Sequence, residues 1–156
     1  MMMLNTVFDK QSIKLDLAGR TKKAVFAELV EEIVYIHPEL NKNTALAVLW
    51  ERENKMNTSV AAGVAIPHGY YSGASGVVGA LGISRAGIDY GAPDQKPVYF
   101  VFLIIMDEKS REKHLNVLSR VLSLIESGTL VDTQAAGKHR NFGSQQEVYD
   151  ILTRFN

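Results

Sequence analysis

The histidine at position 68 stands in a sequence context that can prepare an imidazole for chemistry. Pro67 precedes it and Gly69 follows it, directly after the short apolar segment 64–66. A proline restricts the path of the chain, and a glycine lets the backbone of a partner protein come close, so the imidazole can project from a defined platform. We therefore predict that His68 lies at the end of a strand and acts as an exposed, neutral nucleophile. The alternative is a strand-end histidine that only hydrogen-bonds to a neighbour.

Other kinds of chemistry find less support in the residues. The chain has no cysteine, which excludes disulfides, thiolate zinc sites, iron–sulfur clusters and thiol nucleophiles. His68 and His114 could in principle bind zinc, but no Asp or Glu has ligand spacing with them, so we predict no metal site. No Ser or Asp stands in a motif that would make His68 the general base of a hydrolase, and there is no glycine-rich phosphate loop of the Walker type.

The composition is that of one soluble globular domain spanning residues 1–156. With 46% hydrophobic and 22% charged residues, the chain is far from the composition of disordered proteins. The 17 Lys and Arg balance 17 Asp and Glu, so no net field attracts nucleic acid or an anionic membrane. The longest apolar run, Val98–Met106, is far shorter than the ~20 residues that span a bilayer. The opening Met1-Met2-Met3 lacks the cationic and apolar regions of a secretory signal, and we predict a cytoplasmic location.

The first half of the chain predicts a strand followed by two helices. Apolar and polar residues alternate over 13–17, as in a half-buried strand. Apolar residues at helical spacing after Thr21, a suitable N-cap, predict a helix that ends near Pro38. A second helix is predicted over about 43–55, with Arg52 in its last turn.

The second half of the chain predicts the centre of a sheet and two more long helices. Residues 77–84 are strand-like, and residues 98–105 are apolar on both faces, as in a central strand. Four apolar residues at helical spacing predict the buried stripe of a long helix: Leu115, Leu118, Leu122 and Ile125. A short helical segment is predicted over 130–135, and a last helix after the capping pattern at 144–147. We therefore predict an α/β single-domain layered fold, with a mixed β-sheet flanked by helices on both faces.

A wider pattern of residues is similar to that of a known family. Its parts are Arg52-Glu53, Thr58, the segment 63–69 around His68, Asp94-Gln95-Lys96-Pro97-Val98 before an apolar strand, and His114-Leu115 at the opening of a helix. This combination resembles enzyme IIA of the sugar phosphotransferase system, in its fructose/mannitol class, which includes the nitrogen-regulatory paralogues. The resemblance covers nearly the whole chain.

The resemblance implies a role for each of three residues. His68 would accept a phosphoryl group through Nε2 from phospho-HPr, with Arg52 and His114 as its companions in the site. The group would then pass to a cysteine of a separate enzyme IIB in sugar uptake. The alternative is a regulatory protein whose phosphorylation at His68 controls its binding to target proteins. No cofactor or metal is implied, and neither nucleic acid binding nor membrane insertion is expected.

The negative charge of a phosphoryl group explains why an arginine and a second histidine would suit a site for its transfer. Because negative charge spreads over three oxygens, catalysis depends on positioning and on charge stabilisation. Arg52 would supply a permanent bidentate cation, and His114 a ring N–H near a helix N-terminus. The alternative for His114 is a half-buried histidine on the helix face beside Leu118. Tyr70 and Tyr71 are predicted either to contact a partner or to be ordinary loop aromatics, one of which covers the core.

The chain departs from the family pattern at three places outside these site residues. Ala61 replaces a common glycine, and Met56-Asn57 stand where the relatives often have Gly-Ser. Met106-Asp107 stand where a proline often follows the central strand. None of these positions is expected to touch the phosphoryl group.

Overall fold

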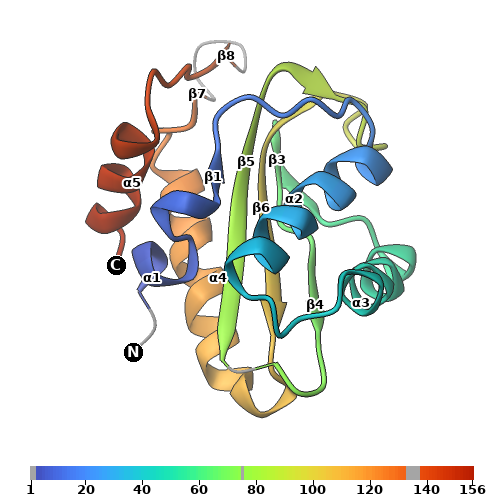
Figure 1. The fold of residues 1–156 in the computed structure, drawn as a ribbon. Coiled ribbons are helices and arrows are strands. Elements are labelled where there is room, and N and C mark those ends of the chain that lie inside the picture. The colour runs from blue at the N-terminus through green and yellow to red at the C-terminus, as the bar shows by residue number, and fades with distance from the viewer. Residues whose placement is uncertain (1–2, 75, 133–137) are drawn as a thin grey trace.

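The centre of the fold is the antiparallel pair of β5 (Val77–Ile88) and β6 (Val98–Met106). The computed structural model describes residues 3–74, 76–132 and 138–156 (Figure 1). Every residue of β6 except Tyr99 is buried, because the strand is covered on both faces. The prediction of a central strand in this apolar run is therefore confirmed.

Short strands extend the central pair into a mixed sheet of six strands. β1 (Ile13–Lys14) runs parallel to β5 at one edge. On the other side of β6, both β3 (Val64–Ala65) and β4 (His68–Tyr70) pair with it in parallel, and β2 (Ser59–Ala61) runs antiparallel to β3. In the described part of the chain, β4 pairs with β6 alone, so its other edge is an edge of the sheet.

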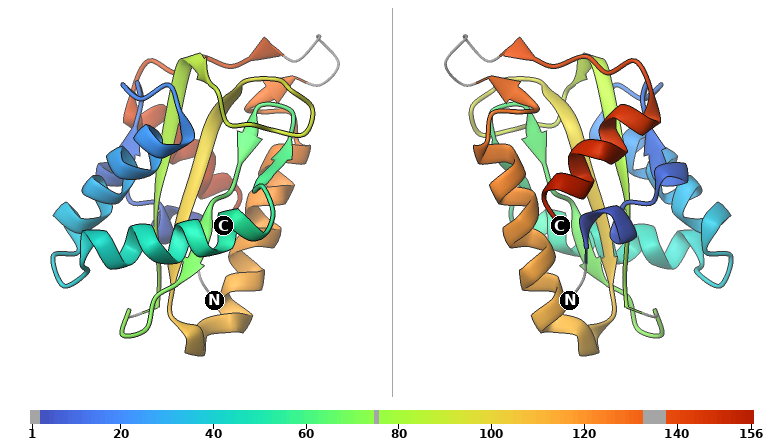
Figure 2. Two further views of the ribbon diagram at one scale, coloured as in Figure 1. Left: turned by 90° about the vertical axis from the view of Figure 1, so that its right-hand side faces the viewer. Right: turned by 90° about the vertical axis from the view of Figure 1, so that its left-hand side faces the viewer.

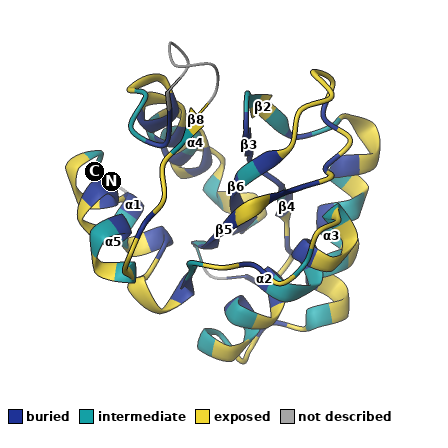
Figure 3. Ribbon diagram, turned by 90° about the horizontal axis from the view of Figure 1, so that it is seen from above, coloured by how far each residue is buried: buried dark blue, intermediate teal, exposed yellow. Residues whose placement is uncertain are grey.

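Helices cover both faces of the sheet, as predicted (Figures 1 and 3). α2 (Lys22–Ile36) and α3 (Lys42–Lys55) lie on one face, and α1 (Leu4–Val7), α4 (Arg111–Glu126) and α5 (Gln145–Arg154) lie on the other. Two single 3-10 turns, Lys10–Ser12 and Glu108–Ser110, precede β1 and α4. No helix in the described ranges combines the length and the apolar character that crossing a bilayer requires.

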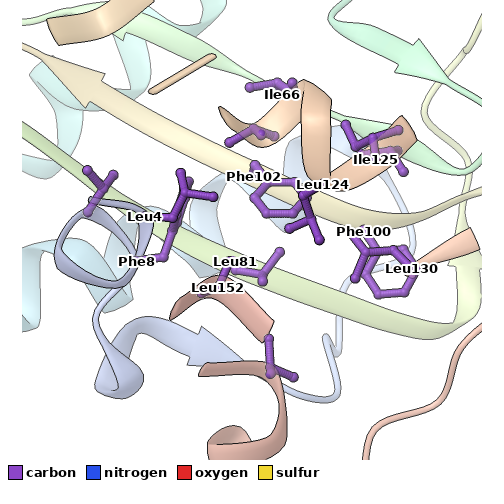
Figure 4. Packing of buried hydrophobic residues seen from close by; sticks show 14 of the residues in the cluster. Leu4, Phe8, Ile66, Leu81, Phe100, Phe102, Leu124, Ile125, Leu130 and Leu152 are labelled. Atoms are coloured by element: carbon purple, nitrogen blue, oxygen red, sulfur yellow. The ribbon is translucent and has the colours of Figure 1, made fainter. Parts of the chain in front are cut away.

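The side chains of β6 alternate between two hydrophobic clusters. Phe100 and Phe102 pack with α1, α4 and α5 (Figure 4), and Ile104 belongs to the same cluster. Val101 and Leu103 pack instead with α2 and α3. This alternation follows from the two-residue period of a strand. The sheet is thus buried on both sides and provides a rigid support for the short strand β4 at its edge.

Three of the long helices begin at side-chain caps. Thr21, Asn41 and Ser144 each accept a hydrogen bond from the backbone N–H three residues further on. Each bond satisfies one of the N–H groups that a helix leaves unpaired at its start. The helices predicted after Thr21, over 43–55 and after Ser144 are confirmed to within one or two residues.

The buried stripe of α4 differs from the predicted one. Leu115 is 65% exposed and Leu122 is 40% exposed. The residues that face the sheet are His114, Val117, Val121, Leu124 and Ile125. Both stripes place apolar residues at helical spacing, and packing against the sheet selects the second. The prediction is therefore wrong for Leu115 and Leu122, whereas Ile125 is buried and Leu118 packs against the core while partly exposed. The observed stripe turns His114 inward.

Two short elements also differ from the sequence predictions. The strand predicted over 13–17 is limited to Ile13–Lys14, although the N–H of Leu17 also donates to the carbonyl of Ile83 in β5 at 2.8 Å. A helical segment is predicted over 130–135, but Val131–Asp132 forms the strand β7, which pairs with β8 (Lys138–His139). The remainder of that predicted segment lies outside the described residues.

Candidate functional site

His68 begins the edge strand β4 rather than ending a strand, so the predicted place of this residue is corrected. In β4 it lies opposite Ile104 of β6, and the Ile104 N–H donates to the carbonyl of Pro67 at 2.9 Å. Directly opposed residues point to the same face of a sheet. Because Ile104 packs on the α4 side, His68 points toward α4 and the next residue, Gly69, points toward α3.

Gly69 makes room for α3, which crosses the sheet at this point (Figure 2). A Cβ atom on Gly69 would lie 2.8 Å from the carbonyl oxygen of Val48, which is too close for any real side chain. The sequence interpretation that this glycine admits the backbone of a partner is therefore wrong, since the backbone is that of α3. Arg52 follows Val48 by one helical turn, so the close approach also brings Arg52 toward His68.

The ring of His68 is held by a single short hydrogen bond. Its Nδ1 lies 2.7 Å from the carbonyl oxygen of Ile66. A carbonyl only accepts, so Nδ1 carries the proton and Nε2 keeps a free lone pair. Burial is the main cause that holds the pKa of His68 below its ordinary value, and the charge of Arg52 adds to it, against the opposing effects of Ile66 and Glu53. The imidazole is therefore neutral at neutral pH.

His114 lies beside His68 in the first turns of α4. The two ring centroids are 5.4 Å apart, with 41° between the ring planes. His114 is only 6% exposed, and its Nδ1 atom finds no hydrogen-bond partner among the described residues. Burial, together with the neighbouring His68, lowers the pKa of His114 to about 4. The structure thus brings together the two histidines that the sequence singles out, both in the neutral form.

Arg52 approaches the same place from α3. Its guanidinium donates from Nη1 to the carbonyl oxygen of Met56 at 2.7 Å, which ties down the end of its own helix. Arg52, His68 and His114 line one hollow of about 440 Å³, whose other charged residues are Glu51, Lys55 and Glu108. All three predicted site residues therefore meet in one open cavity at the edge of the sheet.

The two tyrosines after His68 lie in different surroundings. Tyr70 is partly exposed, lies 5.6 Å from the ring of His114 and is covered by Arg111 at 5.9 Å. Tyr71 is buried and its hydroxyl accepts a hydrogen bond from the N–H of Asn41 at the start of α3. One ring therefore borders the site and the other closes the core.

Sequence reasoning assigned no role to Glu53, which the structure places directly behind the site. Glu53 is 5% exposed, and both of its carboxylate oxygens accept hydrogen bonds from Thr58. A signal was present in the pattern, because Glu53 continues the buried stripe of Ala45 and Leu49 at intervals of four residues. A charged residue on the buried face of a helix needs partners, and such residues often serve a site.

The arrangement suits the transfer of an anionic group. A neutral imidazole with a free ring nitrogen can act as a nucleophile, and a guanidinium and a second imidazole at the same hollow can stabilise the negative oxygens of the group. No cluster of three potential metal ligands occurs in the part of the chain that the structure describes.

Comparison with known proteins identifies the family of this chain. Residues 6–154 match the family model described as phosphoenolpyruvate-dependent sugar phosphotransferase system, EIIA 2. A fructose-specific EIIA component of Haloferax volcanii is 30% identical over 149 residues, which are 96% of this chain and 94% of that protein. A fructose-specific EIIABC component of Bacillus subtilis is 28% identical over 124 residues, and there the chain spans only 20% of the longer protein.

Solved structures agree with this match. The nitrogen regulatory protein IIA-Ntr of Neisseria meningitidis is 29% identical with a TM-score of 0.79, covering 96% of this chain and 99% of that one. The mannitol IIA of Escherichia coli, solved in complex with phosphorylated enzyme IIB, shares the fold at 16% identity, with a TM-score of 0.70 and coverage of 92% and 95%. The family resemblance that the sequence motifs indicate is thereby confirmed: the chain belongs to the EIIA 2 family of the phosphoenolpyruvate-dependent sugar phosphotransferase system.

Proposed function

We propose that this protein is a cytoplasmic phosphocarrier that accepts a phosphoryl group from phospho-HPr on Nε2 of His68 and passes it to an enzyme IIB in sugar uptake. The observation that carries the proposal is the hydrogen bond from Nδ1 of His68 to the carbonyl of Ile66. It leaves Nε2 as the only unprotonated ring nitrogen, in a cavity that also holds Arg52 and His114.

The transfer replaces one phosphorus–nitrogen bond by another, between the imidazole of the donor and that of His68. Nε2 of His68 attacks the phosphorus, and the phosphorus–nitrogen bond of the donor breaks as the new one forms. The electron pair of the broken bond stays on the donor nitrogen, and the Nδ1 proton of His68 stays on its hydrogen bond to Ile66. Arg52 and a ring N–H of His114 stabilise the charge on the phosphoryl oxygens, which is greatest in the transition state and in the phosphorylated product.

The two proposed partners rest on the family and on its solved relatives. The mannitol IIA of Escherichia coli was solved with phosphorylated enzyme IIB, which supports an enzyme IIB as the acceptor for this chain. HPr as the donor follows from the resemblance of the site motif to that of the family. The exposed ring of Tyr70 beside His114 would belong to the surface that both partners contact.

A regulatory role is the second candidate. The similarity to nitrogen regulatory proteins favours it, with the Neisseria meningitidis structure at 29% identity and a relative from Pseudomonas aeruginosa at 26% over 138 residues. In that role the phosphoryl group on His68 would alter binding to a target protein instead of moving on to an enzyme IIB.

Labelled phosphate distinguishes these functions. We expect the parent protein to take label from phospho-HPr and the His68→Ala variant to take none, while both keep the same circular dichroism spectrum and melting temperature. His37→Ala is the matched control, since His37 lies at the end of α2 and is not among the residues that line the cavity of His68. Labelling of the His68→Ala variant would place the nucleophile elsewhere. Onward transfer to an enzyme IIB supports the carrier role, whereas a stable phosphoprotein that alters target binding supports the regulatory role.

A further inference from the structure

A buried network of polar side chains lies behind the site, and Glu53 is its centre. Oε1 of Glu53 accepts the backbone N–H of Thr58 at 3.1 Å, and Oε2 accepts the Thr58 hydroxyl. Oε1 also pairs with Nζ of Lys22 at 2.9 Å. These three contacts of the carboxylate come from two residues, Lys22 on α2 and Thr58 in the loop after α3.

Tyr90 completes the network from the end of β5. Its hydroxyl lies 2.7 Å from Oγ1 of Thr58, and Nζ of Lys22 lies 4.5 Å above its ring. The single hydroxyl proton of Thr58 goes to Glu53, so Tyr90 is the donor in this pair. Burial and the nearby Glu53 raise the pKa of Tyr90, which keeps this donor protonated. A buried network in which each polar group has a partner is rigid.

The network reaches both His68 and Arg52 through backbone carbonyls of one loop. The carbonyl of Thr58 accepts the N–H of Ile66 at 2.9 Å, and the carbonyl of Ile66 in turn accepts Nδ1–H of His68. Two residues before Thr58, the carbonyl of Met56 accepts the guanidinium of Arg52. One carboxylate thus anchors the loop whose Met56 carbonyl holds Arg52 and whose Thr58 carbonyl holds Ile66, the residue that orients His68.

We propose that Glu53 is a positioning residue for phosphoryl transfer, because its carboxylate clamps Thr58 so that the Ile66 carbonyl orients His68 and the Met56 carbonyl orients Arg52. The proposal rests on the proposed function of His68. Glu53 is not among the residues that line the cavity of His68 and Arg52, so it acts only through these neighbours. Its negative charge also favours the protonated form of His68, opposing the effect of Arg52 on the pKa.

Replacement of Glu53 by glutamine tests the clamp. Glutamine has nearly the same shape but lacks the charge that holds Lys22, and its amide cannot accept all three hydrogen bonds. We expect the turnover number for phosphoryl transfer from phospho-HPr to fall by up to about 10²-fold, as for a small misplacement of reacting groups. KM for phospho-HPr should stay unchanged, because the docking surface is not altered.

Nitrogen NMR of the labelled histidine gives a second readout that simple destabilisation does not move. In the parent protein we expect the proton of neutral His68 on Nδ1. In the Glu53→Gln variant we expect a mixture of both tautomers, because the Ile66 carbonyl is no longer held in place. The pKa of His68 should also fall, since a charge that favours the protonated ring has been removed.

Glu28→Gln is the matched control. Glu28 also accepts backbone N–H groups, those of Ala18 and Gly19, and also pairs with a lysine, Lys14, at 3.0 Å. It lies on α2 outside the cavity of His68, so its loss should lower stability without changing the turnover number or the tautomer of His68.

Two variants of Thr58 test the same clamp if the Glu53→Gln protein does not fold. Thr58→Val keeps the shape of the residue and removes the hydroxyl bond to Glu53, and should reduce the turnover number and mix the tautomers. Thr58→Ser keeps the hydroxyl and should retain most of the parent activity. A folded Glu53→Gln or Thr58→Val protein with the parent turnover number and a pure Nδ1–H tautomer would overturn the proposal.

The same experiments distinguish an error in the proposed role of His68 from an error in the proposed role of Glu53. If the parent protein takes no phosphate from phospho-HPr, or if the His68→Ala variant is labelled, the role of His68 is wrong. The tautomer and pKa of His68 still decide, without any phosphoryl transfer, whether Glu53 orients the ring. An unchanged tautomer and pKa in the Glu53→Gln variant would then exclude the clamp as well.

Discussion

The Cα of Gly69 lies directly against the carbonyl oxygen of Val48, so that a Cβ atom at position 69 would sit 2.8 Å from that oxygen. This contact couples the strand that begins with His68 to the helix that carries Arg52. The distance between the nucleophile and the cation therefore depends on a glycine that takes no part in the chemistry.

Gly69→Ala should consequently impair both stability and transfer. The added methyl group meets backbone atoms of α3, which can give way only if the helix moves, and such overpacking costs about 1–3 kcal/mol. We expect a lower melting temperature and a slower transfer from phospho-HPr, as Arg52 moves away from His68. Gly143→Ala is the control, because a Cβ there would lie 3.9 Å from Oε2 of Glu147, an ordinary van der Waals distance. Equal transfer rates in the two variants would contradict this coupling.

Arg52→Gln should slow transfer without preventing it. Removal of one charge-stabilising donor from a site of this kind costs about 10²- to 10³-fold in rate, or about 3 to 4 kcal/mol. The pKa of His68 should rise at the same time, because the charge of Arg52 lowers it. Both effects can be measured, by rapid-quench labelling and by NMR titration. Arg154→Gln, at the exposed end of α5, is the control, and an unchanged rate in the Arg52→Gln variant would mean that Arg52 does not contact the phosphoryl group.

His114 should affect the phosphorylated state more than the free one. Nδ1 of its buried ring has no hydrogen-bond partner among the described residues, and the ring centroid lies 5.4 Å from that of His68. We therefore expect a phosphoryl group on His68 to offer His114 a hydrogen bond that the free protein lacks. We expect His114→Ala to bind HPr normally and to accept phosphate slowly, but to hold or pass on the group with an altered lifetime. His114→Gln retains a donor and should recover part of the loss. If both variants match the parent in rate and in phosphohistidine lifetime, His114 is only a buried histidine of the helix.

The stability of the protein should fall as the pH decreases from 6.5 toward 4. His114 has a pKa of about 4 in the folded protein against a reference value of 6.5. Between these values the unfolded chain binds a proton that the folded protein does not, so protonation favours unfolding. Above pH 6.5 this contribution is fully present, and below pH 4 its loss is complete. Urea unfolding at a series of pH values should show a smaller decrease for His114→Gln than for the parent protein, and identical slopes would assign the decrease to other groups.

Local sequence was sufficient for much of the fold. Thr21 and Ser144 mark helix starts, because a capping side chain acts within three residues of its own position. The apolar run 98–106 specifies a strand covered on both faces, because no exposed face could carry so many apolar side chains. The motif around His68 also identified the nucleophile candidate and, through the family pattern, Arg52 and His114.

Local sequence could not show which face of α4 is buried. Leu115 and Leu122 lie on one apolar stripe of this helix, and Val117 and Val121 lie on another. Helical periodicity shows that a buried stripe exists, but the choice between two apolar stripes depends on where the helix meets the sheet. The error mattered for the site, because only the stripe with the valines turns His114 toward His68.

The order of residues in the chain specifies which chemical groups the site contains, since an imidazole between proline and glycine, an arginine and a second histidine are properties of the sequence. How these groups are held depends on three-dimensional packing. The contact of Gly69 with Val48, and the clamp of Glu53 on Thr58, join segments whose relative position is set by packing on the two faces of one sheet. Packing of this kind depends on long-range contacts, and no local spacing of residues records it.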